Sequence, residues 1–222
     1  MPFRFPVALE LSGRRCVVIG GGPEAERKCR ALLDADADVV VIAPVITPGL
    51  GDLTRRGEVG HVARRYEPGD LAGAFLAFTT DADRAAPAAV FAEAQRERVL
   101  CNAADDVEHC HFAVPSIVRR GELLLAISTG GRAPALAKRL RHRLSAELGW
   151  EWAALVDLLG EVRAETLPAR TVDFPTWAAR WRRVLDREDE LLGLLAEGRI
   201  AEARDRVRAA VTDVARPSSR AS

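Results

Sequence analysis

The chain has 222 residues, with 32 basic against 32 acidic residues, 48% apolar residues and 5% aromatic residues. At roughly 150 residues per domain this length predicts one or two domains, and the apolar content excludes global disorder. No apolar run approaches the roughly 18 residues of a membrane span, and residues 1–10 lack the features of a secretory signal. A net charge of zero argues against a nucleic-acid-coating protein. We therefore expect a cytoplasmic protein with neither a membrane nor a nucleic-acid partner.

The four cysteines show no C-x-x-C pairing: Cys16, Cys29, Cys101 and Cys110. In a reducing compartment this spacing predicts small buried side chains, neither a disulfide framework nor a structural zinc site.

The first hundred residues alternate short apolar strands with helices. The strands are expected at Arg15 to Ile19, Val39 to Ile42, Val59 to Ala63, Phe75 to Thr79 and Val99 to Asn102, with helices at Pro23 to Asp34 and about Asp83 to Arg98. Continuous apolar strands that alternate with helices indicate a parallel sheet covered on both faces. The predicted fold class is α/β, with a Rossmann-type NAD-binding domain over residues 1–113.

The pattern changes after Pro115. Ser116 to Arg120 and Glu122 to Ser128 predict a strand hairpin, followed by a basic helix from about Pro134 to Leu148. This segment, 114–148, is too small to bury both faces of its hairpin, so we expect it to pair with the same segment of a second chain in a homodimer. Residues 149–215 predict a helical domain interrupted at Pro168, Pro175 and Gly198, with Trp150, Trp152, Trp177 and Trp181 as apolar anchors; residues 216–222 are expected to be a disordered tail.

A glycine-rich turn joins the first strand to the first helix. Gly20, Gly21, Gly22, Pro23, Glu24 and Ala25 fit G-x-G-x-x-A. Such a turn lets the backbone approach a pyrophosphate, and the helix N-terminus offers N–H groups to it. The alternative is a glycine turn with no ligand.

The acid that usually binds the ribose hydroxyls is missing. Ile42, Ala43 and Pro44 close the second strand without a carboxylate. Either backbone groups near Pro44 and Val45 hold the ribose, or the cofactor differs; NADP is not favoured, since no arginine replaces the acid.

Two more polar loops follow strands of the same sheet. Thr79, Thr80 and Asp81 follow the fourth strand, and Asn102 closes the fifth. In an open α/β sheet these loops face the glycine turn, which makes the four residues candidates for cofactor binding. The alternative for Asp81 and Asp83 is a cap on the next helix.

Several strings in continuous order carry a family resemblance: VVIGGGPEAERKCRALL, TTD, CNAADD, FAVPSIVRRGELLLAISTGG and RAPALAKRLR. Over about residues 3 to 145 the chain resembles the precorrin-2 dehydrogenase family, which also forms the N-terminal part of siroheme synthases. The resemblance implies NAD-dependent oxidation of precorrin-2 to sirohydrochlorin, joined in some members by ferrous iron insertion. It places the essential acid/base on Asp105 and implies dimerisation through the hairpin. No methyltransferase domain follows residue 222, so we expect another protein to supply the methylation.

A tetrapyrrole substrate with eight carboxylates needs several cations or N–H donors. Between Arg119 and Arg143 seven basic residues stand against Glu122 alone. The candidates for substrate binding are Arg119, Arg120, Ser128, Thr129, Gly130, Gly131, Arg132 and Lys138. Pro134 is a favoured first helical residue after this loop, although Ala133 is a poor N-cap. The alternative for the basic helix is a solvated face.

His109, Cys110 and His111 pose the question of a metal. Histidines at i and i+2 share one face of a strand, yet a transition metal usually needs a third or fourth ligand, so we assign no metal ligand. Ferrous iron enters only as a second substrate. The alternative function is a non-catalytic NAD-binding sensor or regulatory module, which would leave Asp105 without a role.

Overall fold

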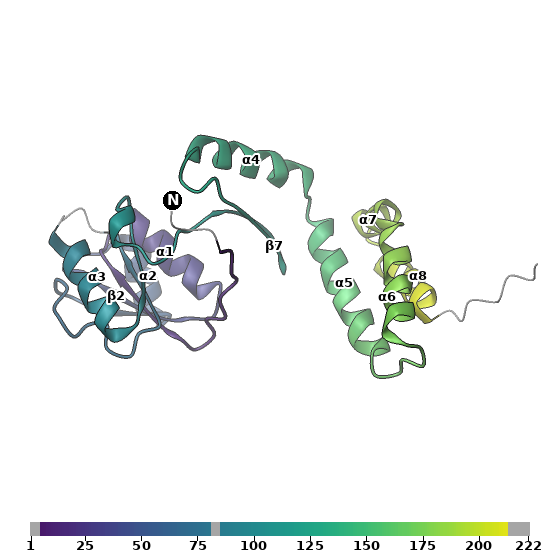
Figure 1. Ribbon diagram of the computed structural model, residues 1–222, viewed down its shortest axis with the longest axis horizontal. Helices are drawn as coiled ribbons and strands as arrows, with labels where there is room; N and C mark the ends of the chain where they lie inside the picture. Colours follow the sequence, from purple (N-terminus) through teal and green to yellow (C-terminus); the bar gives the residue numbers. More distant parts are fainter. Residues whose placement is uncertain (1–4, 81–84, 213–222) are drawn as a thin grey trace, which may run out of the picture. The chain divides into compact units, whose positions relative to one another are not determined.

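The computed structural model describes residues 5–80 and 85–212 (Figure 1). The chain divides into two compact units, with the boundary between Val114 and Pro115. Each unit has a hydrophobic core of its own.

The first unit is built on a five-stranded parallel sheet. Its strands are β1 (Arg15–Ile19), β2 (Asp38–Ile42), β3 (Val59–Val62), β4 (Leu76–Thr79) and β5 (Leu100–Ala103), in the spatial order β3-β2-β1-β4-β5. Every neighbouring pair is parallel. The predicted Rossmann-type fold is confirmed, and its strand order reverses between β1 and β4, the point where α/β sheets of this kind bind ligands.

Helices cover both faces of the sheet. On one face, α1 (Pro23–Leu33) and α2 (Pro48–Arg55) bury Cys29 and Leu50 against strand residues such as Val18 and Val41. On the other, α3 (Ala85–Glu97) buries Val90 and Ala94. The alternate residues of β1 point to opposite cores, which explains why this strand is apolar throughout.

Helix α2 is not among the elements predicted from the sequence. Its sequence, PGLGDLTR, begins with a proline and contains two glycines, which mask the helical period. The helix forms because Thr47 accepts a hydrogen bond from the Leu50 N–H at 3.2 Å and Pro48 occupies the first turn.

The second unit begins with the antiparallel hairpin of β6 (Ser116–Arg120) and β7 (Leu123–Ile127). Helix α4 (Pro134–Glu147) lies along the hairpin (Figure 1). Val118 is buried on the covered face. On the opposite face Ile117 and Leu124 are 40% and 42% exposed, so that side is only partly covered by the described residues.

Four helices complete the second unit: α5 (Glu151–Thr166), α6 (Phe174–Leu185), α7 (Glu188–Ala196) and α8 (Ile200–Thr212) (Figure 1). They share a core around Leu158, Val162, Leu195 and Val207. Trp177 is buried as predicted. Trp150 is 60% exposed, because it stands before the first turn of α5 and outside the core of the helix bundle. Within the described ranges no helix is long and apolar enough to cross a membrane.

Candidate functional site: a nucleotide cradle and an exposed carboxylate

The glycine turn follows β1 at the reversal of strand order. Gly20 has a φ of 119°, a conformation that residues with a Cβ rarely adopt. At Gly21 an added Cβ would lie 1.9 Å from the carbonyl oxygen of Val45, so only glycine fits beneath the loop after β2. Gly22 has no neighbour within 4 Å of an added Cβ. The space around Gly21 is therefore filled by the loop after β2, whereas the space beside Gly22 is free.

The N-terminus of α1 carries no side-chain cap; Gly22 is its N-cap and Pro23 stands in the first turn. Uncapped N–H groups with an open space before them can receive a phosphate. Glu24 would oppose an anion, but it pairs with Arg27 and with Lys28 at 3.3 Å. These features fit the pyrophosphate of NAD, which makes Gly20, Gly21, Gly22 and Pro23 its candidate cradle and gives Glu24 an ion-pairing role.

The loop after β2 is held by two side-chain contacts that the sequence pattern does not predict. Thr47 donates to Glu26 of α1 at 2.5 Å, and this hydrogen bond, with that from Arg30, lowers the pKa of the Glu26 carboxyl. The Nε2 of His61, in β3, lies 2.9 Å from the carbonyl oxygen of Ala43. Pro44 and Val45 are exposed between these contacts. The backbone groups of this carboxylate-free loop are therefore candidates for ribose binding. A polar His61 within a strand was the sequence signal for the second contact.

The loop after β4 begins against the glycine turn. Thr80 donates to the Ile19 carbonyl through its N–H at 2.9 Å and its hydroxyl at 3.2 Å. The buried hydroxyl of Thr79 has no partner among the described residues. Asp81 and Asp83, predicted for cofactor binding or capping, lie outside the described residues.

Asp105 lies in the turn after β5. Its backbone has a φ of 59°, its side chain is exposed, and its carboxylate has no hydrogen-bond or ion-pair partner in the part of the chain that the structure describes. Asn102, a candidate for cofactor binding, donates its amide N–H to the Phe112 carbonyl at 2.8 Å. The turn therefore presents Asp105, and Asn102 supports the turn.

The two histidines of the loop do not share a strand face. Residues 107–109 form a short 3-10 helix, which removes the expected extended geometry. The Nδ1 of His109 lies 2.6 Å from Asp106, whereas His111 accepts from the Cys101 N–H at 3.1 Å and stacks on Phe91. No cluster of three metal-binding side chains occurs over residues 5–80 and 85–212. All four cysteines are free.

In the second unit, the loop before α4 folds on its own side chains. The Ser128 hydroxyl accepts from the Gly130 N–H at 3.1 Å, and the Thr129 hydroxyl accepts from the Ala133 N–H at 3.2 Å. Gly130 and Gly131 have φ values of 59° and 75°. Ala133 provides no side-chain cap, as expected, so the start of α4 keeps free N–H groups.

The basic residues of this unit differ in whether their charged groups already have partners within the chain. Arg119, Arg132 and Lys138 are exposed and form no ion pair with any described residue. Arg120 donates to the carbonyls of Leu148 at 2.7 Å and Ser145 at 2.6 Å, at the C-terminal end of α4. Most of the Arg120 donors therefore cap the end of α4, which leaves this side chain less free than the other three to bind a substrate carboxylate.

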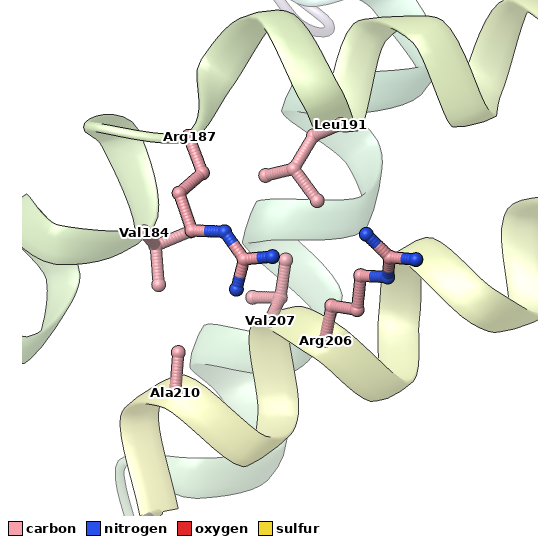
Figure 2. A pocket seen from close by; sticks show the side chains of 6 residues that line it. All are labelled: Val184, Arg187, Leu191, Arg206, Val207 and Ala210. Atoms are coloured by element: carbon pink, nitrogen blue, oxygen red, sulfur yellow. The ribbon is translucent and has the colours of Figure 1, made fainter.

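A shallow hollow lies between α6, α7 and α8, where Val184, Leu191, Val207 and Ala210 form an apolar floor (Figure 2). Figure 2 shows the guanidinium groups of Arg187 and Arg206 projecting over it. Both pair with Glu190, and Arg206 also pairs with Glu202 at 2.5 Å, so two carboxylates stand against the two guanidinium groups. Their charges are therefore balanced, and this hollow does not select an anion.

Comparison with known proteins supports this description. An NAD(P)-binding family model matches residues 7–116, and the model of the sirohaem biosynthesis protein central region matches residues 120–147. The chain is 38% identical over 182 residues to "Siroheme synthase" of Photobacterium profundum, covering 82% of this chain and 38% of that protein. It is 36% identical over 198 residues to "Siroheme synthase 3" of Aeromonas hydrophila, covering 89% and 42%.

The chain thus spans less than half of the length of the siroheme synthases that it matches. The solved structure of "SirC, precorrin-2 dehydrogenase" has the same fold, with a TM-score of 0.65 and 24% identity over 92% of this chain and 98% of that one.

Proposed function

This chain belongs to the family of the precorrin-2 dehydrogenases and of the matching part of the siroheme synthases, and we propose that it oxidises precorrin-2 to sirohydrochlorin with NAD. The observation that carries the proposal is the exposed, unpartnered carboxylate of Asp105 at the carboxyl edge of the sheet that holds the glycine turn. A non-catalytic sensor would have no use for this carboxylate.

In this reaction each group of the chain has a separate task. NAD, when bound, supplies the acceptor for the hydride that leaves the macrocycle. The N-terminus of α1 binds its pyrophosphate, and Asp105 accepts the proton that leaves with the hydride. Arg119, Arg132 and Lys138, with the open start of α4, bind substrate carboxylates.

The test is turnover of precorrin-2 with NAD by the purified protein, followed by the absorbance of sirohydrochlorin. Asp105→Asn keeps the size of the side chain but removes the base, so kcat falls by roughly 100-fold or more while the Kd for NAD stays unchanged. Glu108→Gln is the matched control, since it neutralises another exposed carboxylate of the same turn, and its activity stays at the wild-type level. NAD binding without turnover by the wild type would favour the sensor and overturn the proposal.

We further propose that ferrous iron is inserted into sirohydrochlorin. The relatives named siroheme synthase support this step. The macrocycle itself supplies four nitrogen ligands, so the protein needs a base and not a ligand cluster. Anaerobic incubation with sirohydrochlorin and Fe²⁺ gives siroheme faster than the spontaneous reaction; an equal rate excludes the activity.

A homodimer through the hairpin is also proposed. The more exposed face of β6 and β7 carries Ile117 beside Ala126 and Arg119 beside Leu124, as the strand register requires. Two strands alone are marginally stable, and α4 covers only their other face. Leu124→Glu should convert the dimer to a monomer in sedimentation analysis. Ile200→Glu, at another exposed apolar residue, should not; a monomeric wild type rejects the dimer.

A further inference from the structure

The backbone of Asp105 is held in a conformation that side chains disfavour. Its φ of 59° lies in the left-handed region, where a Cβ crowds the following carbonyl. Aspartate tolerates this region better than most residues, yet such a conformation persists only where the surroundings enforce it. The turn from Ala103 to Cys110 must therefore contain the restraint.

The thiol of Cys110 lies at the centre of that turn. It accepts a hydrogen bond from the Ala103 N–H at 3.1 Å. It also lies within donor distance of two carbonyl oxygens, 3.1 Å from that of Asp106 and 3.3 Å from that of Ala103. The single S–H proton serves one of these at a time. Cys110 thus connects the last residue of β5 with the residue that follows Asp105.

The thiol is suited to this task because it stays protonated. Burial raises the pKa of Cys110, so at neutral pH the group remains a donor as well as an acceptor. The Asp106–His109 pair closes the same turn at 2.6 Å and lowers the pKa of the Asp106 carboxyl. Asp106 is therefore engaged by its own partner.

We propose that Cys110 is a positioning residue for proton transfer by Asp105: its thiol ties the end of β5 to the turn and holds Asp105 in the left-handed conformation that exposes its carboxylate. This inference rests on the proposed dehydrogenase function. It requires that loss of the thiol lowers kcat without weakening cofactor binding, because the glycine turn lies two strands away.

The experiment compares Cys110→Ala and Cys110→Ser in the full chain. Cys110→Ala should lower kcat about tenfold, with KM for precorrin-2 and Kd for NAD within about twofold of wild type. Cys110→Ser retains a donor and an acceptor, so it should restore kcat to within about threefold of wild type. Cys29→Ala, at a buried cysteine of α1 outside the turn, is the control for loss of a core thiol and should leave kcat unchanged.

The inference fails if the kcat of Cys110→Ala equals that of wild type. It also fails if Cys110→Ser folds but its kcat falls about tenfold, the loss expected for Cys110→Ala. Should Cys110→Ala not fold, the serine variant decides alone, and its crystal structure should keep a positive φ at Asp105. Wild-type turnover separates the two proposals. Without it the dehydrogenase function itself fails, whereas wild-type turnover with an indifferent Cys110→Ala rejects only the positioning role.

Discussion

Replacing Gly21 by alanine places a methyl group against the loop that follows β2. The added Cβ would lie 1.9 Å from the Val45 oxygen and 3.0 Å from the Ala43 Cβ. An ordinary contact requires the loop to retreat by about 1.5 Å. The obstacle is backbone held by Thr47 and His61, which cannot rotate away. We expect a loss of about 1–3 kcal/mol in the free energy of unfolding, typical of overpacking.

The assay is urea unfolding combined with calorimetric titration of NAD, and two other glycines serve as comparisons. Gly22→Ala has open space and an unstrained φ of −83°, so it should fold normally and yet bind NAD at least about tenfold more weakly, because its methyl group occupies the approach of the pyrophosphate. Gly51→Ala, in α2 with nothing within 4 Å, should be stabilised by about 0.5–1 kcal/mol. A Gly21→Ala protein as stable as wild type would refute the reasoning.

Three further predictions concern stability. Glu93 is 1% exposed; burial opposes its charge, but hydrogen bonds from Tyr66 and the Leu71 N–H hold its pKa below 4.5. Its contribution is therefore complete above about pH 4.5 and lost as the pH falls through the lowered value, and Glu93→Gln should flatten the acid limb of unfolding measured against pH. Arg120→Ala should cost about 1–2 kcal/mol in urea unfolding through loss of the α4 cap; an unchanged midpoint contradicts this role. Trp177→Phe should cost less than about 1.5 kcal/mol, since the buried indole N–H has no partner in the described chain, whereas Trp177→Ala should cost about 3–5 kcal/mol in the same assay.

Local pattern was sufficient for most elements. The sheet and its helices were predictable from the apolar strands and the glycine turn, because the hydrophobic period of each element is visible in the sequence. Helix α2 was missed, since proline and glycine conceal a helix whose stability comes from Thr47 and the packing of Leu50 and Leu53. Trp150 was predicted to be an apolar anchor, but its hydrophobicity alone does not show whether it lies inside the helix or before its first turn.

The sequence by itself was enough to predict the fold class and to mark the glycine turn as a candidate cradle, because both depend on apolar periods and residue types at short, fixed spacing. Asp105 became a candidate through the family resemblance of the string CNAADD. Tertiary structure decided what Arg120, Asn102 and Cys110 do: one caps a helix, and the others brace the turn that presents Asp105. The partners of these three side chains are set by how strand ends and helix ends meet. Sequence spacing does not encode how these ends meet, so the hydrogen bonds that these side chains make within the chain were visible only in the structure.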